Sequence, residues 1–304
     1  MIDISKISTE IRNENTKNID IITTKRMIEL INNEDKTVAF AVEKSIDQIT
    51  KVVDVVTQAF LKGGRLFYVG AGTSGRLGVL DASECPPTFG VSPNMIIGIV
   101  AGGDYALRHA VEGVEDLRDE GASDLASYDL NQDDIVIGIA ASGRTPYVLG
   151  GISYAKRQGI TTCCITTSLD SELARLVDYP IEVITGPEPL TGSTRMKSGT
   201  AQKMVLNMIS TTTMIKIGKV YENSMIDVQM SNLKLFSRAT RIVMDITGVS
   251  QEEAERKLKD FDSVKYAIFS ILTKIDDVNT IKDYFQKSQN NFREAIQQAK
   301  LKNQ

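Results

Sequence analysis

Two glycine-rich turns contain the residues whose types and spacing could do chemistry. The first, residues 70–75 (GAGTSG), follows the apolar run 66–69, and the second, residues 140–145 (AASGRT), follows the Ile- and Val-rich run 134–139. A strand that ends in small and hydroxyl residues and then opens a helix presents free backbone N–H groups to an anion. We therefore expect a small phosphorylated molecule to be bound by Gly72, Thr73, Ser74, Ser142, Gly143, Arg144 and Thr145.

Other interpretations of the two turns stay open at this point. The first turn also matches the Gly-x-Gly-x-x-Gly pattern of dinucleotide-binding proteins, which need an acidic residue at the end of the second strand. Here that strand, 95–100, is followed by Asp104, which fits better as the N-cap of the next helix. A purely structural tight turn is the second alternative. Thr145 and Pro146 also fit an ordinary helix start.

Glu84 is a candidate general acid. We expect the helix that begins near Ser74 to close at residues 83–87 (SECPP), where a glutamate opposes the helix dipole and its pKa is raised. Ten residues of helix span about 15 Å. There are two ways for Glu84 to act at a phosphate site. Either the helix ends early and the chain folds back to the first turn, or Glu84 serves a site that is shared with a second subunit.

A second acidic segment, residues 109–116 (HAVEGVED), is expected on the helix after the second strand. Glu112, Glu115 and Asp116 would share one helix face, and their mutual repulsion would raise at least one pKa toward the range of a base. The alternative is a solvated acidic face. His109 is expected to pack or cap as readily as to act in catalysis.

The segment 192–200 (GSTRMKSGT) combines two cations with several hydroxyl groups before a long helix expected from about Thr200 to Lys219. Either Arg195 or Lys197 binds a phosphate or carboxylate, or the segment is simply a capped helix start.

Five short Val- and Ile-rich runs, with helical stretches between most of them, predict the architecture. They cover residues 65–70, 95–100, 134–139, 161–166 and 181–185. This alternation predicts an α/β fold with a doubly wound, five-stranded parallel sheet flanked by helices on both faces. Ligands of such sheets bind beyond the carboxyl ends of the strands, where both turns fall.

The flanking sequence is expected to be helical, and three domains are predicted. A short helix near 24–32 precedes one helix over 38–61, ended by Gly63-Gly64, and a candidate helix over 223–246 precedes a capping box at Ser250 and Glu253. We predict an N-terminal arm (1–37), a phosphosugar-binding catalytic domain (38–239) and a small all-helical domain (240–304).

Composition narrows the class of protein. A net charge of −4 argues against nucleic-acid binding, and no apolar run approaches the roughly 20 residues of a membrane span. Residues 1–6 show no signal peptide. Three cysteines without CxxC spacing indicate reduced thiols in a cytosolic protein, and a single histidine makes a transition-metal site improbable.

Four segments together resemble the N-acetylmuramic acid 6-phosphate etherases, bacterial enzymes of the sugar isomerase (SIS) superfamily. They are residues 70–88, 109–116, 140–147 and 186–203 (GPEPLTGSTRMKSGTAQK), the last similar to a signature shared with glucokinase regulatory proteins. The resemblance covers the chain from about Asn18 to the C-terminal helices. It implies a SIS-type fold, a cytoplasmic homodimer without a cofactor, Glu84 as the proton donor and Glu115 as the second catalytic carboxylate.

The implied reaction releases D-lactate from N-acetylmuramic acid 6-phosphate and leaves N-acetylglucosamine 6-phosphate, which is carbon–oxygen lyase chemistry. Glu115 would remove the C2 proton of the ring-opened sugar while Glu84 protonates the departing lactate oxygen, and water would then add at C3. A phosphosugar isomerase would use the same sheet and release no lactate. A non-enzymatic phosphosugar sensor is a further alternative, although glucokinase regulators are longer chains with a duplicated SIS domain. A transcription regulator would carry a basic helix-turn-helix arm, which residues 1–37 lack.

Overall fold

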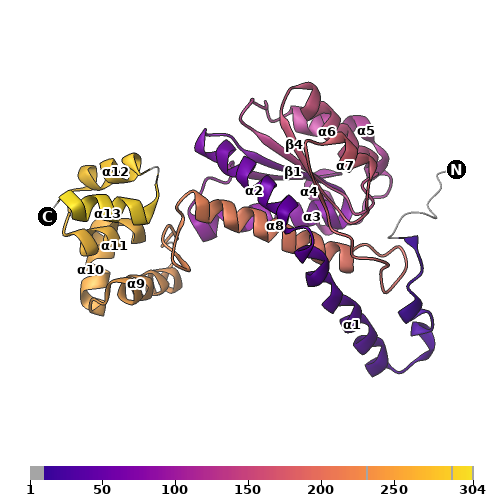
Figure 1. Ribbon diagram of the computed structural model, residues 1–304, viewed down its shortest axis with the longest axis horizontal. Coiled ribbons are helices and arrows are strands. Elements are labelled where there is room, and N and C mark those ends of the chain that lie inside the picture. Colours follow the sequence, from indigo (N-terminus) through magenta and orange to yellow (C-terminus); the bar gives the residue numbers. More distant parts are fainter. Residues whose placement is uncertain (1–9, 231, 289, 303–304) are drawn as a thin grey trace. The chain divides into compact units, whose positions relative to one another are not determined.

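The computed structural model describes residues 10–230, 232–288 and 290–302 (Figure 1). Residues 1–6, on which the signal-peptide prediction depends, lie outside this part of the chain. The chain divides into two compact units, Met1–Ser83 with Pro93–Ser210, and Glu84–Ser92 with Thr211–Gln304.

Two helices, α1 (Thr24–Glu43) and α2 (Ile46–Leu61), precede the sheet. The expected short helix near 24–32 is wrong in length, because α1 runs for 20 residues and takes in the first part of the expected helix 38–61. The chain breaks at Ser45, whose hydroxyl donates to the Glu182 carbonyl at 2.8 Å and ties the break to the sheet. Gly63, with a positive φ of 86°, follows the end of α2 as expected.

The five-stranded parallel sheet is confirmed. Its strand order is β2-β1-β3-β4-β5, with Val69 of β1 aligned to Gly138 of β3 and to Ile99 of β2. The carboxyl ends of neighbouring strands therefore meet at one edge. The strands are β1 (Leu66–Gly70), β2 (Ile96–Val100), β3 (Ile135–Ile139), β4 (Thr161–Thr166) and β5 (Tyr179–Glu182).

Helices cover both faces of the sheet, as expected. One face packs against α6 (Pro146–Arg157), and Gly138 has no room for a side chain there, since a Cβ would lie 2.9 Å from Val148 and Ile152. The opposite face packs against α3 (Gly72–Phe89), whose backbone at Val79 would lie 2.5 Å from a Cβ at Gly98. Figure 1 shows α5 (Arg118–Ala126) with α6, and α2 and α8 (Lys197–Lys216) with α3. The short helices α4 (Gly103–Arg108) and α7 (Glu172–Leu176) follow β2 and β4.

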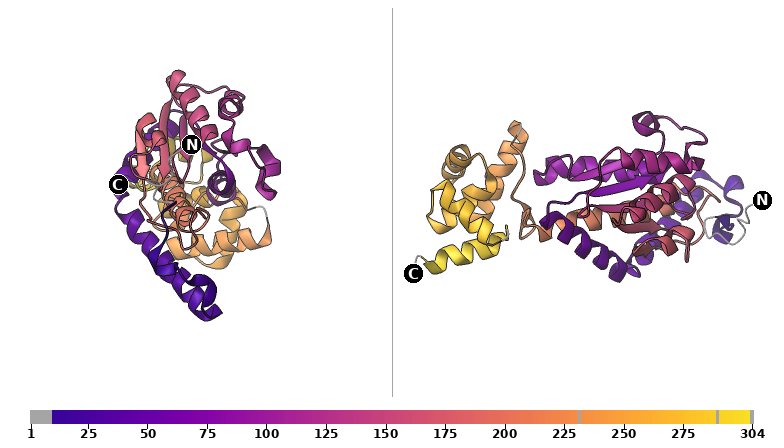
Figure 2. Two further views of the ribbon diagram at one scale, coloured as in Figure 1. Left: turned by 90° about the vertical axis from the view of Figure 1, so that its right-hand side faces the viewer. Right: turned by 90° about the horizontal axis from the view of Figure 1, so that it is seen from above.

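The second unit consists of Glu84–Ser92 and of Thr211–Gln304, and the C-terminal part forms a small helical bundle, coloured orange to yellow in Figure 2. The expected helix 223–246 is wrong in its first part, because a two-stranded hairpin stands there with Glu222 at a positive φ of 55°. Ser250 caps α10 as predicted and accepts from the Glu253 N–H at 3.3 Å. The predicted boundary at residue 240 lies within α9. The elements are β6 (Val220–Tyr221), β7 (Ser224–Met225), α9 (Leu233–Thr247), α10 (Gln251–Phe261), α11 (Val264–Thr273), α12 (Val278–Lys287) and α13 (Phe292–Lys302).

The described residues include no helix long and apolar enough to cross a membrane.

The first glycine-rich turn requires close packing of backbone against backbone. A Cβ at Gly75 would lie 2.6 Å from the Gly70 carbonyl oxygen and 2.7 Å from the Val100 side chain. The end of β1 and the start of α3 can approach this closely only because both positions are glycine.

Gly75→Ala is therefore expected to lower the free energy of unfolding by about 2 kcal/mol, since the backbone must shift to admit the methyl group. Urea unfolding measures the change. Gly199→Ala in α8 is the control, because its Cβ would meet nothing closer than 3.4 Å and alanine favours a helix. Equal stability of the Gly75→Ala variant and the wild type would contradict the close approach.

Candidate functional site

The first turn lies at the carboxyl end of β1 and opens α3, which begins at Gly72. Ser74 is buried and its Oγ donates to Gln202 Oε1 of α8 at 2.9 Å. Thr73 lies next to Gly199 at the start of the same helix. The Ser74 hydroxyl thus holds the turn to α8, while the first N–H groups of α3 have no partner within the helix.

The second turn lies at the carboxyl end of β3 and opens α6. Thr145 is the N-cap and Pro146 the first helical residue, as predicted. Gly143 adopts a positive φ of 63°, and a Cβ there would lie 2.2 Å from Ser171 Oγ. The Ser142 hydroxyl accepts from the Arg144 N–H at 3.3 Å. This turn is therefore fixed in place, with Arg144 exposed beside it.

The first turn of α8 connects the two glycine-rich turns. Thr167, after β4, donates its hydroxyl to the Ala141 carbonyl at 3.1 Å and to Ser198 Oγ at 3.0 Å. Ser198 and Gln202 are one helical turn apart, so α8 contacts the second turn through Thr167 and the first turn through Ser74. Our sequence interpretation missed all three of these partners. Thr167 could have been found, because it follows a strand as both turns do.

Glu188 occupies the N-terminus of α8. Its side chain is completely buried and accepts from the Lys197 N–H at 2.7 Å and the Ser198 N–H at 2.9 Å. The positive end of this helix is therefore neutralised by a carboxylate of the protein itself. In contrast, α3 and α6 have no acidic residue in their first turns. Their N-termini remain available to an external anion.

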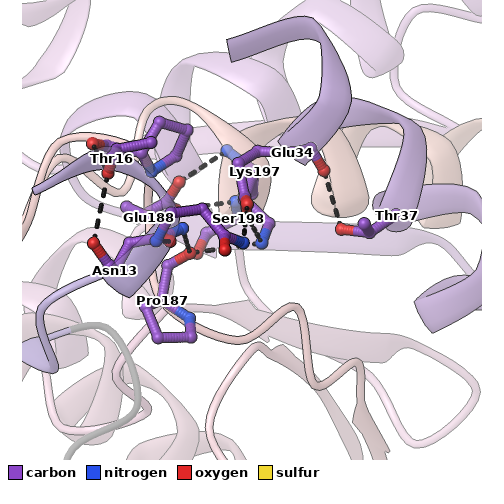
Figure 3. Close-up of polar contacts among 10 residues, drawn as sticks. Asn13, Thr16, Glu34, Thr37, Pro187, Glu188, Lys197 and Ser198 are labelled. Atoms are coloured by element: carbon purple, nitrogen blue, oxygen red, sulfur yellow. Dashed lines mark hydrogen bonds and ion pairs between the residues drawn. The ribbon is translucent and has the colours of Figure 1, made fainter. Parts of the chain in front are cut away.

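Lys197 points into a buried cluster (Figure 3). The side chain is 4% exposed, and Nζ donates to Glu34 Oε2 at 2.8 Å and to the Pro187 carbonyl at 3.2 Å. Of the two interpretations of this segment, the contacts of Lys197 favour the structural one, in which the segment is the start of a helix and Lys197 binds groups of the protein itself. The expectation that Lys197 binds a ligand anion is corrected accordingly, whereas Arg195 is exposed.

Glu34 is held in its charged form. Burial by itself would raise its pKa, but hydrogen bonds from Lys197, Asn15 and Asn13 outweigh burial, so the pKa lies below its ordinary value. Asn15 Nδ2 donates to Glu34 Oε1 at 2.8 Å. The Glu34–Lys197 ion pair therefore stabilises the fold at pH values above the ordinary pKa of Glu34. This stabilisation is lost as the pH falls through the lowered pKa of Glu34 in the folded protein.

Asp81 is a second buried carboxylate that our sequence interpretation missed. It accepts from Asn207 at 2.9 Å, Ser210 at 3.0 Å and Tyr68 at 3.1 Å. Burial raises its pKa, and these hydrogen bonds oppose the rise. The residue joins α3, α8 and β1.

Glu84 is exposed on α3, in the part of the helix that belongs to the second unit. The expected helix end at this residue is wrong, because α3 continues through Pro86 and Pro87 to Phe89 and is ended by Gly90 at a positive φ of 63°. Glu84 therefore lies within α3 and not at its end.

The acidic segment 109–116 is not helical as expected. The helix α4 ends at Arg108, and Gly113, with a positive φ of 77°, precedes a short 3-10 helix over Val114–Asp116. Glu112, Glu115 and Asp116 are exposed and do not share a helix face. Gly102, rather than Asp104, is the N-cap of α4, since its left-handed conformation turns the chain there.

Arg76 fixes the start of this segment. Its guanidinium donates to the carbonyls of Ala106 at 2.9 Å and His109 at 3.0 Å, so α3 holds the residues that lead to Glu115. The His109 ring stacks on Tyr105 with ring centroids 4.1 Å apart, which favours the packing role among those expected for it. Arg76 directly follows the first turn, and the sequence interpretation gave it no role.

All three cysteines are buried free thiols, as expected. Among the described residues, no group of three or more His, Cys, Asp or Glu side chains could hold a metal ion.

Family models match most of the chain. Residues 16–156 match the glucokinase regulatory protein N-terminal SIS domain, residues 116–211 match the SIS domain, and residues 222–299 match the C-terminal lid domain of glucokinase regulatory protein.

Curated relatives match over nearly the whole chain. An N-acetylmuramic acid 6-phosphate etherase from Clostridium botulinum (strain Hall) is 53% identical over 98% of both chains. One from Actinobacillus pleuropneumoniae serotype 5b is 50% identical over 96% of both chains. A solved phosphoheptose isomerase from Francisella tularensis is 18% identical with a TM-score of 0.49, covering 62% of this chain and all of its own. At these values it supports no functional conclusion.

Glu34→Gln removes the carboxylate that neutralises Lys197. The free energy of unfolding is expected to fall by about 3 kcal/mol near pH 7, because a buried ammonium loses its partner. The difference from wild type should shrink as the pH falls from the ordinary Glu34 pKa of 4.5 through the lowered pKa of the folded protein, because the wild-type carboxylate is then protonated as well. Urea unfolding across this pH range measures it. Glu29→Gln, whose exposed partner is Arg26, is the control, and a loss that does not depend on pH would contradict the assignment.

Proposed function

The chain belongs to the family of N-acetylmuramic acid 6-phosphate etherases, and we propose that it releases D-lactate from N-acetylmuramic acid 6-phosphate and forms N-acetylglucosamine 6-phosphate in amino-sugar recycling. The observation that carries this proposal is the identity of 50–53% over almost the full length of named etherases. The arrangement of the two turns supports a substrate with a phosphate group.

The phosphate binds at the N-termini of α3 and α6. Gly72, Thr73 and Ser74 provide backbone N–H groups at one turn, and Ser142, Gly143 and Thr145 line the other. Both turns follow strands whose carboxyl ends meet at one edge of the sheet. The absence of acidic residues in the first turns of these two helices supports anion binding there, whereas Glu188 already fills the N-terminus of α8.

The two exposed glutamates supply acid–base chemistry of the lyase type. In the ring-opened sugar, Glu115 takes the C2 proton, the C–H electrons form the C2=C3 double bond, and the C3–O bond breaks as Glu84 protonates the lactate oxygen. Water then adds its hydroxyl at C3 and gives its other proton to Glu84, while Glu115 returns its proton to C2, so each glutamate regains its starting form. Exposure of both side chains supports these roles, since a substrate can reach them.

The enzyme acts as a cytoplasmic homodimer without a cofactor. Reduced, buried cysteines support the location. Exposed Ile28 and Phe40, 62% and 66% accessible on α1, support burial against a second copy. A shared site would let one subunit supply Glu84 to the turns of the other.

Purified wild-type protein is expected to release D-lactate from N-acetylmuramic acid 6-phosphate. Glu84→Gln should lower this rate by about 100- to 10,000-fold, the usual contribution of a general acid. Glu115→Gln should also stop exchange of the C2 hydrogen in heavy water. Glu112→Gln, an exposed neighbour, is the control.

Each outcome has a distinct meaning. Aldose–ketose conversion without lactate would support an isomerase, and phosphosugar binding without turnover would support a sensor. Unchanged C2 exchange in the Glu115→Gln variant would overturn the assignment of the base.

Arg195 is assigned to the lactyl carboxylate, because the N–H groups of the two turns already serve the phosphate. The Thr194 carbonyl accepts from Gly199 N–H at 2.9 Å, and Gly199 lies next to Thr73, so Arg195 is close in sequence to a residue held beside the first turn. Arg144, exposed beside the second turn, is a further candidate for contact with the substrate.

Arg195→Gln is expected to raise KM for the substrate about 10- to 100-fold, the range of a hydrogen bond between charged groups. Inhibition by N-acetylglucosamine 6-phosphate should stay unchanged, because this product keeps the phosphate and has no lactyl group. Steady-state kinetics measure both, with Arg26→Gln as the matched exposed control. If substrate and product affinity fell together, Arg195 would bind the phosphate instead.

A further inference from the structure

Residues 13–16, here called the strap, lie against the loop that enters α8. Asn13 Nδ2 donates to the Pro187 carbonyl at 3.3 Å, and Thr16 Oγ1 donates to the Pro189 carbonyl at 2.7 Å. Asn13 is 7% and Thr16 is 5% exposed, so these bonds are shielded from water. They satisfy carbonyls of a loop that lies outside the strands and helices.

A second connection reaches the same loop through α1. Asn15 of the strap donates to Glu34, which binds the Lys197 ammonium, and Lys197 also donates to the Pro187 carbonyl. Figure 3 shows the Glu34 side chain, from α1, and the Lys197 side chain, at the start of α8, directed toward each other. The strap and the Glu34–Lys197 pair thus hold the loop at Pro187, at Pro189 and at its end.

The held loop leads directly to the candidate site. It contains Arg195 and ends in the first turn of α8, where Ser198 bonds Thr167 beside the second glycine-rich turn. Gln202, one turn later, bonds Ser74 of the first. A displacement of the loop would therefore change groups on both sides of the proposed phosphate site.

We propose that the strap and Glu34 are positioning residues for substrate binding, acting through the loop 187–196. This inference rests on the proposed function. The side chains bond loop carbonyls and the Lys197 ammonium, and the loop presents Arg195 to the substrate. A loop fixed before binding loses less conformational freedom when the substrate arrives, which improves affinity without changing the chemical step.

Thr16→Val tests the proposal, because valine keeps the shape and removes the bond to Pro189. KM for N-acetylmuramic acid 6-phosphate should rise about threefold to tenfold with kcat nearly unchanged, the factor that corresponds to one hydrogen bond used equally in ground and transition states. Thr37→Val is the matched control. Its hydroxyl donates to the Glu34 backbone carbonyl at 2.7 Å within α1 and touches no loop residue in the described contacts. Asn13→Ala, which removes the bond to Pro187, is the second variant and should act in the same direction.

Hydrogen exchange of the amides in 187–196, measured without substrate, provides a readout independent of activity. Exchange should be faster in the Thr16→Val and Asn13→Ala variants than in wild type or Thr37→Val. Wild-type exchange, or faster exchange with unchanged KM, would overturn the positioning role. A wild-type protein that releases no lactate would count against the proposed function, while hydrogen exchange would still decide whether the strap holds the loop.

Discussion

The pairing of buried charges at the first turn of α8 is the interaction on which the rest of the site depends. Lys197, Glu34 and Glu188 are almost removed from water, and a buried charge is tolerated only when it is paired and hydrogen-bonded. Glu188 neutralises the helix end, and Glu34 neutralises Lys197. With these charges satisfied, α8 can lie between the two glycine-rich turns and bond both through Ser198 and Gln202.

The carboxylates divide into two groups by burial. Glu34, Asp81 and Glu188 are buried and accept hydrogen bonds from groups on other elements, so they join α1, α3 and α8 into one framework. Glu84 and Glu115 are exposed. A carboxylate fully used by structural hydrogen bonds cannot readily exchange a proton with a substrate, whereas an exposed one can. The division therefore agrees with the proposed assignment of chemistry to Glu84 and Glu115.

Helix N-termini show a similar division. The helices α3, α6 and α8 begin at the edge of the sheet where the strands end. The N-terminus of α8 binds a carboxylate of the protein itself, that of Glu188. The other two follow glycine-rich turns and keep their first N–H groups without an acidic neighbour in the first turn. The dipole of α8 thus binds a structural carboxylate, whereas the dipoles of α3 and α6 are available for a ligand anion.

Local patterns of apolar residues, glycine and proline were enough to predict the parallel sheet, the two turns and the start of α6 at Thr145-Pro146. The sequence interpretation was wrong at the end of α3, which Gly90 ends and not Pro86. It was also wrong for the segment 109–116, where Gly113 turns the chain and no continuous helix forms. Lys197 and Arg195 stand in one polar segment, and their sequence surroundings do not distinguish them. The folded chain brings Glu34, 163 residues away, against Lys197 and leaves Arg195 exposed. The local sequence shows where charged residues stand. Burial depends on distant segments, and it decides which of these charges pair within the protein and which stay exposed to a ligand.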